Sequence, residues 1–216
     1  TLTVNKTRAL YADAPPLVSV VLPAFNAART LKAALNSLFV QEPAVGCPLP
    51  PFEIIVVNDG STDDSAALLE TCAAEKAALG RLRVLHLPHR GIVAALNAGL
   101  AAARGSVIAC MDAGDTVHPL RLALQTSHLW GKNALTLSAS LAAFGGDRAT
   151  AYGFAHFVDW QNSLQSPTEI SRNRFRDTPV CHPTTMFRRE AADRWGAYAD
   201  GDFAEDWELW LRWLHE

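Results

Sequence analysis

The chain has 216 residues, of which 49% are hydrophobic and 19% are charged, and its formal net charge is −3. A hydrophobic fraction of this size can fill the core of one large α/β domain, or of one domain and part of a second. The slightly acidic charge balance argues against a general nucleic-acid binder, which normally presents a basic face.

Four short segments rich in valine and isoleucine are predicted to be β-strands. They are residues 17–23 (LVSVVLP), 52–57 (FEIIVV), 83–87 (RVLHL) and 106–111 (SVIACM). Their hydrophobic residues run almost without interruption, which is typical of parallel strands that are buried on both faces.

Amphipathic helical patterns separate these predicted strands. The first follows Thr30, a candidate N-cap residue, the second follows residues 61–64 (STDD), and the third follows Gly91. The alternation of strands and helices predicts an α/β fold with a mostly parallel central sheet, flanking helices and right-handed crossovers.

The C-terminal part of the sequence is less regular, with scattered aromatic and polar residues from about 121 to 180. A last helix is predicted from about Ala204. The apolar side chains on one of its faces are Trp207, Trp210, Leu211 and Leu214. We interpret this stripe as a surface that faces the core rather than a binding surface. No stop signal follows within the chain, so we expect a C-terminal continuation.

The four cysteines, Cys47, Cys72, Cys110 and Cys181, are widely spaced and form no C-x-x-C pair. Three of them stand among apolar residues, which favours buried free thiols over a disulfide framework or a zinc site. We therefore expect a cytoplasmic protein, and peripheral contact with the inner face of the membrane stays open. Residues 1–16 lack the apolar core of a signal peptide and are expected to be an N-terminal extension. No stretch is long enough to span a membrane.

Polar or glycine-bearing turns follow all four predicted strands. They are residues 24–26 (AFN), 58–63 (NDGSTD), 89–91 (HRG) and 112–115 (DAGD). Because ligands bind outside the carboxyl ends of the strands in an open parallel sheet, these turns should meet on one rim. Any one of them alone is ordinary turn chemistry, but four together favour a nucleotide-sized binding site.

Two common nucleotide-binding loops are missing from the sequence. No G-x-G-x-x-G follows the first predicted strand and no G-x-x-x-x-G-K-[ST] occurs, which argues against dinucleotide oxidoreductases and P-loop enzymes. What remains is Asp59, a carboxylate suited to a base or a ribose, together with Asp112 and Asp115, an acidic pair suited to a metal-bound diphosphate.

Five segments resemble, in the same order, motifs of the family-2 inverting nucleotide-sugar glycosyltransferases. They are VSVVLPAFNAARTLKAALNSL, FEIIVVNDGSTDDS, GIVAALNAGLAAARGSVIACMDAGD, HPTTMFRRE and AEDWELWLR. The resemblance covers residues 17–216 and implies a glycosyltransferase A fold, which is Rossmann-like. It also implies a nucleotide-sugar-binding half, residues 17–120, and an acceptor-binding half of the same domain, residues 121–216.

In the nucleotide-sugar-binding half, the resemblance assigns donor contacts at the positions that match. These are Pro23, Phe25, Asn26, Asp59, Arg90, Gly91 and Asn97. The resemblance places the Phe25 ring near the nucleobase and gives Asp59 the contact to the base or the ribose. The last three positions match the family pattern less specifically.

The turn at residues 112–115 departs from the family pattern. Asp112, followed by Ala113, matches the first acid of the D-x-D element, but Gly114 stands where the usual metal contact is expected. Asp115 matches the further acid that often follows. We expect Asp112, Ala113 and Gly114 to contact the donor, and Asp112 and Asp115 to hold Mn²⁺ or Mg²⁺ with altered coordination. Gly114 would let the backbone approach the phosphates in a conformation barred to other residues.

In the acceptor-binding half, Asp206 matches the carboxylate that acts as general base, with Glu205 as the next candidate. An acid at this position is also typical of an N-cap or of a first helical turn. His182 and Trp160 are acceptor-side candidates, although a lone histidine is often structural and Trp160 can equally pack under the loop.

Two adjacent arginines, Arg188 and Arg189, can in principle meet a phosphate. We interpret them as solvated residues of a loop.

The resemblance implies transfer of a sugar from a nucleoside-diphosphate donor, with a UDP-sugar favoured, to an acceptor hydroxyl with inversion. Such a displacement needs charge stabilisation on the leaving diphosphate and a base on the opposite side. We expect a sugar or lipid-linked sugar as acceptor, in bacterial polysaccharide or glycoconjugate synthesis.

Two other functions stay open. One is a catalytically silent sugar-nucleotide-binding module, with Gly114 as a lost ligand. The other is a sugar nucleotidyltransferase, against which the segment PAFNAART argues because it has no glycine and a single arginine.

Overall fold

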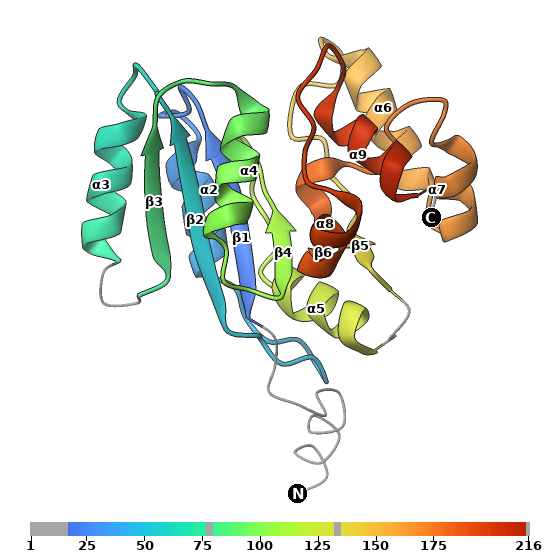
Figure 1. Ribbon diagram of the computed structural model, residues 1–216, viewed down its shortest axis with the longest axis horizontal. Coiled ribbons are helices and arrows are strands. Elements are labelled where there is room, and N and C mark those ends of the chain that lie inside the picture. Colours follow the sequence, from blue (N-terminus) through green and yellow to red (C-terminus); the bar gives the residue numbers. More distant parts are fainter. Residues whose placement is uncertain (1–16, 77–79, 132–134, 215–216) are drawn as a thin grey trace, which may run out of the picture.

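The computed structural model describes residues 17–76, 80–131 and 135–214, so the expected extension at residues 1–16 lies outside the described residues. A central sheet runs through the molecule, and a group of helices stands beside one of its edges (Figure 1). The strands are β1 (Val18–Ala24), β2 (Phe52–Asp59), β3 (Leu82–Leu87), β4 (Val107–Cys110), β5 (Leu137–Ala139) and β6 (Thr185–Arg188).

The sheet has the strand order β3-β2-β1-β4-β6-β5 within the described residues. The first four strands in this order are parallel to one another, whereas β6 runs antiparallel to both β4 and β5. The predicted mostly parallel α/β sheet is confirmed. Strands β5 and β6 are not predicted, because strands of three and four residues are too short to show a hydrophobic periodicity.

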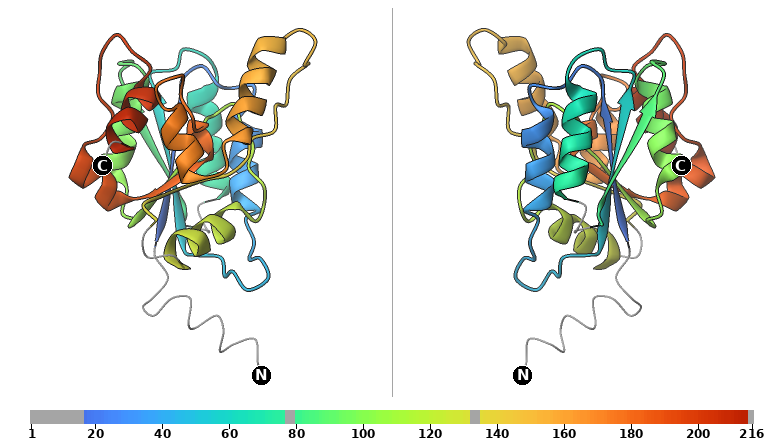
Figure 2. Two further views of the ribbon diagram at one scale, coloured as in Figure 1. Left: turned by 90° about the vertical axis from the view of Figure 1, so that its right-hand side faces the viewer. Right: turned by 90° about the vertical axis from the view of Figure 1, so that its left-hand side faces the viewer.

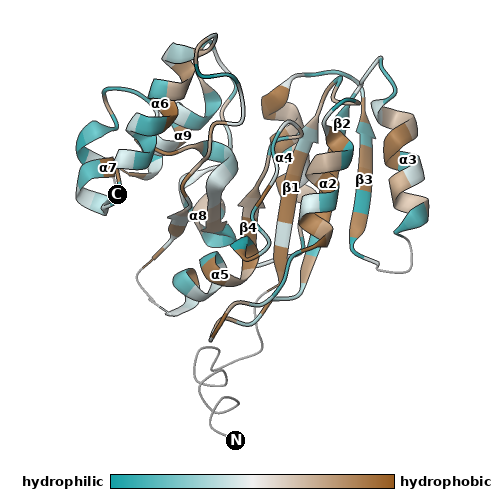
Figure 3. Ribbon diagram, turned by 180° about the vertical axis from the view of Figure 1, so that it is seen from behind, coloured by the Kyte–Doolittle hydropathy of each residue, from teal (hydrophilic) through white to brown (hydrophobic). Residues whose placement is uncertain are grey.

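Helices cover both faces of this sheet and also stand beside one of its edges. They are α2 (Leu31–Phe39), α3 (Ser65–Glu75), α4 (Ile92–Ala102), α5 (Arg121–Gly131), α6 (Tyr152–Ser163), α7 (Pro167–Asn173), η2 (His182–Thr184), α8 (Arg189–Trp195) and α9 (Glu205–Trp213). In Figure 2, α2 and α3 lie on one face and α4 on the other. One hydrophobic cluster joins the sheet to α2, α3 and α5, and a second joins it to α4, α8 and α9. Burial on both faces explains why the parallel strands are hydrophobic along their length (Figure 3).

The last helix presents a different face to the core from the one expected. The buried side chains of α9 are Leu209, Trp210 and Trp213. Trp207 is only half-buried, and its indole Nε1 donates to the carbonyl oxygen of Arg174 at 2.7 Å. The five apolar residues of this short helix form an arc wider than one stripe, so spacing alone does not select which of them are buried.

The paired arginines are not solvated loop residues. Arg188 ends β6 and donates to the carbonyl oxygen of Leu129 at 2.9 Å, near the end of α5. Arg189 begins α8 and donates to the carbonyl oxygens of Leu100 and Ala103 at the end of α4, at 2.8 and 2.6 Å. Both guanidinium groups therefore satisfy carbonyl groups at helix ends, where a cation is also favoured by the helix dipole.

All four cysteines are free thiols, as expected. Only Cys72 and Cys110 are buried, whereas Cys47 and Cys181 are partly exposed, so two rather than three are core residues. In the described part of the chain, none of the helices has the length and the apolar character needed to cross a membrane.

The strand order places a ligand site at one point of the sheet. Strands β1, β2 and β3 follow one another toward one edge, and the chain then returns to place β4 on the other side of β1. Such a reversal opens a crevice outside the carboxyl ends of the two central strands, here β1 and β4. The turns at residues 24–26 and 112–115 both lie at this crevice.

Candidate functional site

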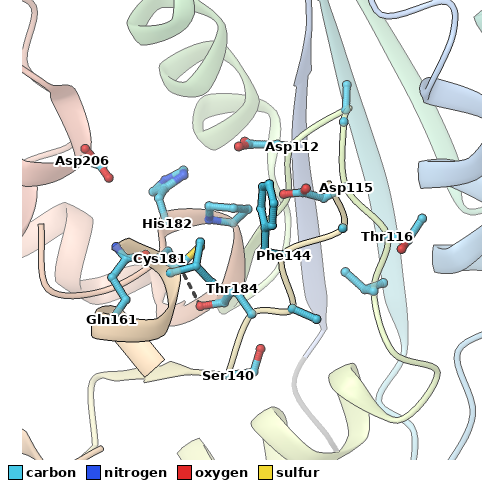
Figure 4. A pocket seen from close by; sticks show the side chains of 18 of the residues that line it. Asp112, Asp115, Thr116, Ser140, Phe144, Gln161, Cys181, His182, Thr184 and Asp206 are labelled. Atoms are coloured by element: carbon cyan, nitrogen blue, oxygen red, sulfur yellow. Dashed lines mark hydrogen bonds between the residues drawn. The ribbon is translucent and has the colours of Figure 1, made fainter. Parts of the chain in front are cut away.

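A cavity of about 1230 Å³, called the main cavity below, opens beyond the carboxyl ends of β1 and β4 (Figure 4). Its lining comes from both halves of the chain. Of the residues singled out in the sequence, it brings together Pro23, Phe25, Asn26, Asp112, Ala113, Gly114, Asp115, His182, Glu205 and Asp206. Residues more than 90 positions apart thus share one cavity at the switch point of the sheet, whereas Asp59, Arg90, Gly91, Asn97 and Trp160 do not line it.

The turn after β4 supplies two acidic side chains to this cavity. The backbone N–H of Asp115 donates to the carbonyl oxygen of Asp112 at 3.2 Å, which closes the turn. Burial raises the pKa of Asp112, and the nearby Asp115, Glu205 and Asp206 raise it further, against the opposing effect of His182. Such a cluster of carboxylates is short of positive charge, so it favours a bound cation.

Gly114 has an open environment and an ordinary backbone conformation. Its φ lies outside the positive range, and a Cβ atom added there would have no neighbour within 4 Å. The expectation that Gly114 adopts a conformation barred to other residues is therefore wrong. Because the position is open and unstrained, a larger side chain fits there without moving the turn.

Asp206 lies in the first turn of α9 and points into the main cavity, across from Asp112 (Figure 4). Its Oδ1 accepts a hydrogen bond from the Trp207 N–H at 2.7 Å, and its Oδ2 accepts one from the Thr178 hydroxyl at 3.3 Å. Asp206 is a first-turn acid rather than the N-cap, which is Ala204, and the helix N-terminus stabilises an acid there while its side chain faces the cavity. Glu205, one residue earlier, also lines the cavity.

His182 lies between the two groups of carboxylates and is 9% exposed. Its Nε2 is 2.7 Å from the Tyr198 hydroxyl, a contact that fixes the ring. Burial by itself lowers the pKa of His182, but Cys110, Asp112 and Asp206 outweigh burial and raise that pKa to about 9. The imidazole is therefore a cation at neutral pH, placed among acids.

Arg121 is a buried residue of this site that the sequence does not reveal. Its guanidinium donates to the carbonyl oxygens of Cys110 and Thr185 at 2.9 and 3.1 Å, and to Gln125 Oε1 at 2.9 Å. Burial lowers its pKa to about 10, which still leaves it charged at neutral pH. The available signal was an arginine and a glutamine four positions apart among leucines and alanines. Residues at this spacing are neighbours on a helix, so the two side chains can hydrogen-bond to each other when they are buried.

Five further lining residues were not singled out as site residues in the sequence. They are Phe144, Phe157, Gln161, Cys181 and Thr184. Burial, followed by the acids Asp115 and Asp112, raises the pKa of Cys181 to about 11, so its thiol stays protonated and is not a nucleophile at neutral pH.

Asp59 is the last residue of β2 rather than a free carboxylate beyond it, and it is 3% exposed. Its Oδ1 accepts from the backbone N–H of Arg90 and its Oδ2 from that of Gly91, both at 2.9 Å. Arg90 and Gly91 thus contact Asp59 through their backbone N–H groups, while the Arg90 side chain is exposed. The carboxylate holds the loop between β3 and α4 against the end of β2.

The Asp59→Ala variant is expected to lose stability because two backbone N–H groups, of Arg90 and Gly91, lose a charged acceptor. The expected fall in the free energy of unfolding is about 1.5–3 kcal/mol, the usual value of a hydrogen bond to a charged group. Urea unfolding followed by circular dichroism measures it, with Asp64→Ala, an exposed acid of the neighbouring loop, as control. Equal unfolding midpoints in the variant and the parent protein would contradict this role.

Asn26 joins the turns after β1 and β2. It has a positive φ of 51°, which asparagine tolerates better than most residues. Its Oδ1 accepts from the backbone N–H groups of Thr62 and Asp63 at 2.8 and 3.3 Å, and its own N–H donates to Ser61 Oγ. The side-chain oxygen of Asn26 therefore holds the turn after β2 against the turn after β1 at the edge of the cavity.

Two of the candidate site residues have partners elsewhere. The Asn97 side chain donates to the Tyr198 carbonyl at 2.8 Å and accepts from the Tyr198 N–H at 3.2 Å, which ties α4 to the segment before α9. The Trp160 ring packs near Phe157, and the Arg176 guanidinium lies over it at 5.3 Å. For Trp160 this is the packing arrangement rather than an open stacking surface.

Comparisons with known proteins agree with this architecture. The sequence model described as "Glycosyl transferase family 2" matches residues 19–196. The succinoglycan biosynthesis protein ExoU of Rhizobium meliloti (strain 1021) is 30% identical over 213 residues, covering 93% of this chain and 58% of that protein. ExoO, another succinoglycan biosynthesis protein of the same strain, is 38% identical over 111 residues, covering 51% of this chain and 29% of that protein. The chain therefore spans a little more than half the length of ExoU and less than a third of the length of ExoO.

Solved structures share the fold at low sequence identity. The mannosyltransferase PcManGT from Pyrobaculum calidifontis, in complex with GDP-Man and Mn²⁺, superposes with a TM-score of 0.65 at 19% identity, covering 96% of this chain and 61% of that one. S. aureus TarS 1–349 in complex with UDP-GlcNAc gives a TM-score of 0.64 at 19% identity, covering 90% of this chain and 52% of that one. The predicted fold, that of the glycosyltransferase A type, is confirmed.

Proposed function

The chain belongs to glycosyl transferase family 2, and from this membership we propose that it transfers a sugar from a nucleoside-diphosphate donor to an acceptor hydroxyl with inversion. The observation that carries the proposal is the opposition of two acidic groups across one cavity. Asp112 and Asp115 lie on the sheet side, and Asp206 lies on the helix side. An inverting displacement needs leaving-group stabilisation and a base on opposite sides of the sugar.

In this proposal the donor lies against the sheet and the acceptor against the helices. Residues 17–120 bind the donor through Pro23, Phe25, Asn26, Asp59 and the turn at 112–115. Residues 121–216 bind the acceptor. A UDP-sugar is the favoured donor. The acceptor is a sugar or a lipid-linked sugar, in bacterial polysaccharide or glycoconjugate synthesis, which the succinoglycan relatives support.

The residues of the acidic turn fit a divalent cation, Mn²⁺ or Mg²⁺. Burial raises the pKa values of both Asp112 and Asp115, so their charges are under-compensated by the protein. Within the described ranges, no cluster of three His, Cys, Asp or Glu side chains is placed to hold a metal ion unaided. Two protein carboxylates completed by phosphate oxygens and water are a common arrangement for Mg²⁺. The bound cation would supply charge neutralisation on the departing diphosphate.

The protein's own residues account for the remaining steps. Asp206 accepts the proton of the attacking hydroxyl, oriented by its hydrogen bonds from Thr178 and the Trp207 N–H. The cationic His182, held by Tyr198, balances the carboxylates around it and orients the acceptor side. The protonated thiol of Cys181 stays out of the reaction.

Calorimetry with UDP tests the donor and metal roles together. The parent protein is expected to bind UDP clearly more tightly in millimolar Mn²⁺ than in EDTA. Asp112→Ala should remove most of this metal dependence, because it deletes the more buried acid of the pair. Gly114→Asp should strengthen it, because the open position accepts a third carboxylate without strain.

Equal UDP affinity in EDTA and in Mn²⁺ would exclude the metal role. If UDP and GDP both fail to bind, the donor assignment is wrong. Binding without any transfer or donor hydrolysis would leave the silent nucleotide-sugar-binding module as the function, with Gly114 as its lost ligand.

A further inference from the structure

A second cavity of about 180 Å³, called the side cavity below, adjoins the main cavity at the ends of β1 and β2. The two cavities share Pro23, Phe25 and Ile92 in their linings, and Asp59 and His89 line only the side cavity. A flat ligand in the side cavity would therefore be continuous with one that reaches the acidic turn.

The His89 side chain lines this cavity and contacts both Phe25 and Asp59. The His89 ring lies parallel to the Phe25 ring, with centroids 4.0 Å apart and an interplanar angle of 16°. The His89 Nδ1 is 2.8 Å from Asp59 Oδ2 and 3.0 Å from the Asp59 carbonyl oxygen. A flat heteroaromatic ring is thus held at this position by stacking on Phe25 and by oxygen acceptors of Asp59 at the edge of the ring.

The same contacts fit a nucleobase that carries a ring N–H, as the uracil and guanine rings do. Phe25 offers an aromatic face, and Asp59 offers two acceptors to a ring donor. Because these acceptors are engaged by His89 Nδ1, a base cannot take up both contacts while the imidazole remains in place.

The His89 imidazole can leave its position against Phe25 without movement of the main chain. The side chain of His89 is 54% exposed, whereas that of Asp59 is 4% exposed. A Cβ atom added to Gly60 would lie 2.5 Å from the His89 backbone nitrogen, so the two loops are packed closely and the His89 backbone is fixed. Rotation of the His89 side chain toward solvent is the movement that the packing allows.

We propose that His89 occupies the nucleobase position of the donor site and competes with the base of the incoming nucleotide. The inference rests on the proposed function, since it takes a nucleoside-diphosphate sugar as the donor. Only the fraction of molecules with His89 swung out binds the base fully, so the apparent affinity is lowered by that fraction. His89 then tunes donor affinity and disfavours bases that cannot replace its contact to Asp59.

The His89→Ala variant tests this competition by calorimetry in the presence of Mn²⁺. UDP and GDP are probes that carry a base, and inorganic pyrophosphate is a probe without one. The variant is expected to bind a base-bearing probe about 3- to 10-fold more tightly than the parent protein, the size of one lost aromatic stack. The affinity for pyrophosphate should not change, because pyrophosphate does not reach the side cavity.

The matched control is His86→Ala, which removes another exposed histidine near the end of β3. His86 contacts Asn58 and Glu70 rather than Phe25, so its removal should leave the affinities for both kinds of probe unchanged. Thermal unfolding of both variants checks that the loops stay folded.

Several outcomes would overturn the inference. Unchanged or weaker nucleotide binding by His89→Ala would show that the imidazole does not compete, and weaker binding would make it part of the platform for the base. An equal gain for pyrophosphate would indicate general loosening of the loop. In these cases the parent protein still binds nucleotide and the proposed function stands. If neither protein binds UDP or GDP, the proposed donor function fails and this inference fails with it.

Discussion

The Asp206→Asn variant is expected to bind the nucleotide donor as tightly as the parent protein and to transfer sugar about 10²–10⁴-fold more slowly, the usual contribution of a general base. Asparagine keeps the shape of the side chain and an oxygen for the Trp207 N–H, so the start of α9 should be preserved. It cannot accept the proton of the attacking hydroxyl. The loss should therefore appear in kcat, with little change in donor affinity.

Two measurements separate these effects. Calorimetry with UDP gives the donor affinity, and release of UDP from the donor, with and without acceptor, gives the rate. Glu205→Gln is the matched control, since Glu205 precedes Asp206 and lines the same cavity. An Asp206→Asn protein that transfers sugar at the parent rate, together with a slow Glu205→Gln protein, would move the base to Glu205.

The Arg121→Met variant is expected to have the largest effect on stability. Its side chain has a similar length but cannot donate to the carbonyl oxygens of Cys110 and Thr185 or to Gln125. Leaving one buried acceptor unpaired costs about 1–3 kcal/mol, so we expect a fall of about 2–4 kcal/mol in the free energy of unfolding. Arg121 is only 6% exposed, so water cannot easily replace it.

Denaturant unfolding measures this fall, and Arg104→Met, which removes an exposed arginine, is the control. The Arg121→Met variant should also raise the pKa of Asp115 further, because the positive charge of Arg121 opposes that rise in the parent protein. An Arg121→Met protein as stable as the Arg104→Met control would show that the guanidinium does not tie the end of β4 to the start of β6.

Two cations of the protein itself, Arg121 and His182, partly balance the carboxylates of the site. Arg121 donates to the carbonyl oxygen of Cys110, just before the acidic turn, and His182 lies between Asp112 and Asp206. His182 does not cancel the effect of burial on Asp112, nor does Arg121 cancel it on Asp115, so the pKa values of both acids remain raised. A divalent cation that binds with the donor diphosphate would supply the missing positive charge.

The sequence by itself determines the parallel part of the sheet and the place of the acidic turn. Uninterrupted hydrophobic runs predict β1 to β4, because a parallel strand covered by helices must be apolar on both sides. Parallel strands bring their carboxyl ends to one rim, so Asn26 and Asp112 are expected to lie near each other although they are far apart in the chain. The family resemblance adds Asp206 on the opposite wall, and the structure places that side chain in the same cavity.

The tertiary structure alone decides which atoms meet. The pairing of β6 with β4, the bonds from the Asp59 carboxylate to two backbone N–H groups, and the stack of His89 on Phe25 join segments whose local patterns say nothing of one another. Periodicity records whether a residue is buried, since burial depends on the local face of a strand or helix. The partner of a buried polar group depends on loops that come together only in the folded chain, because any acceptor in reach satisfies the same donor.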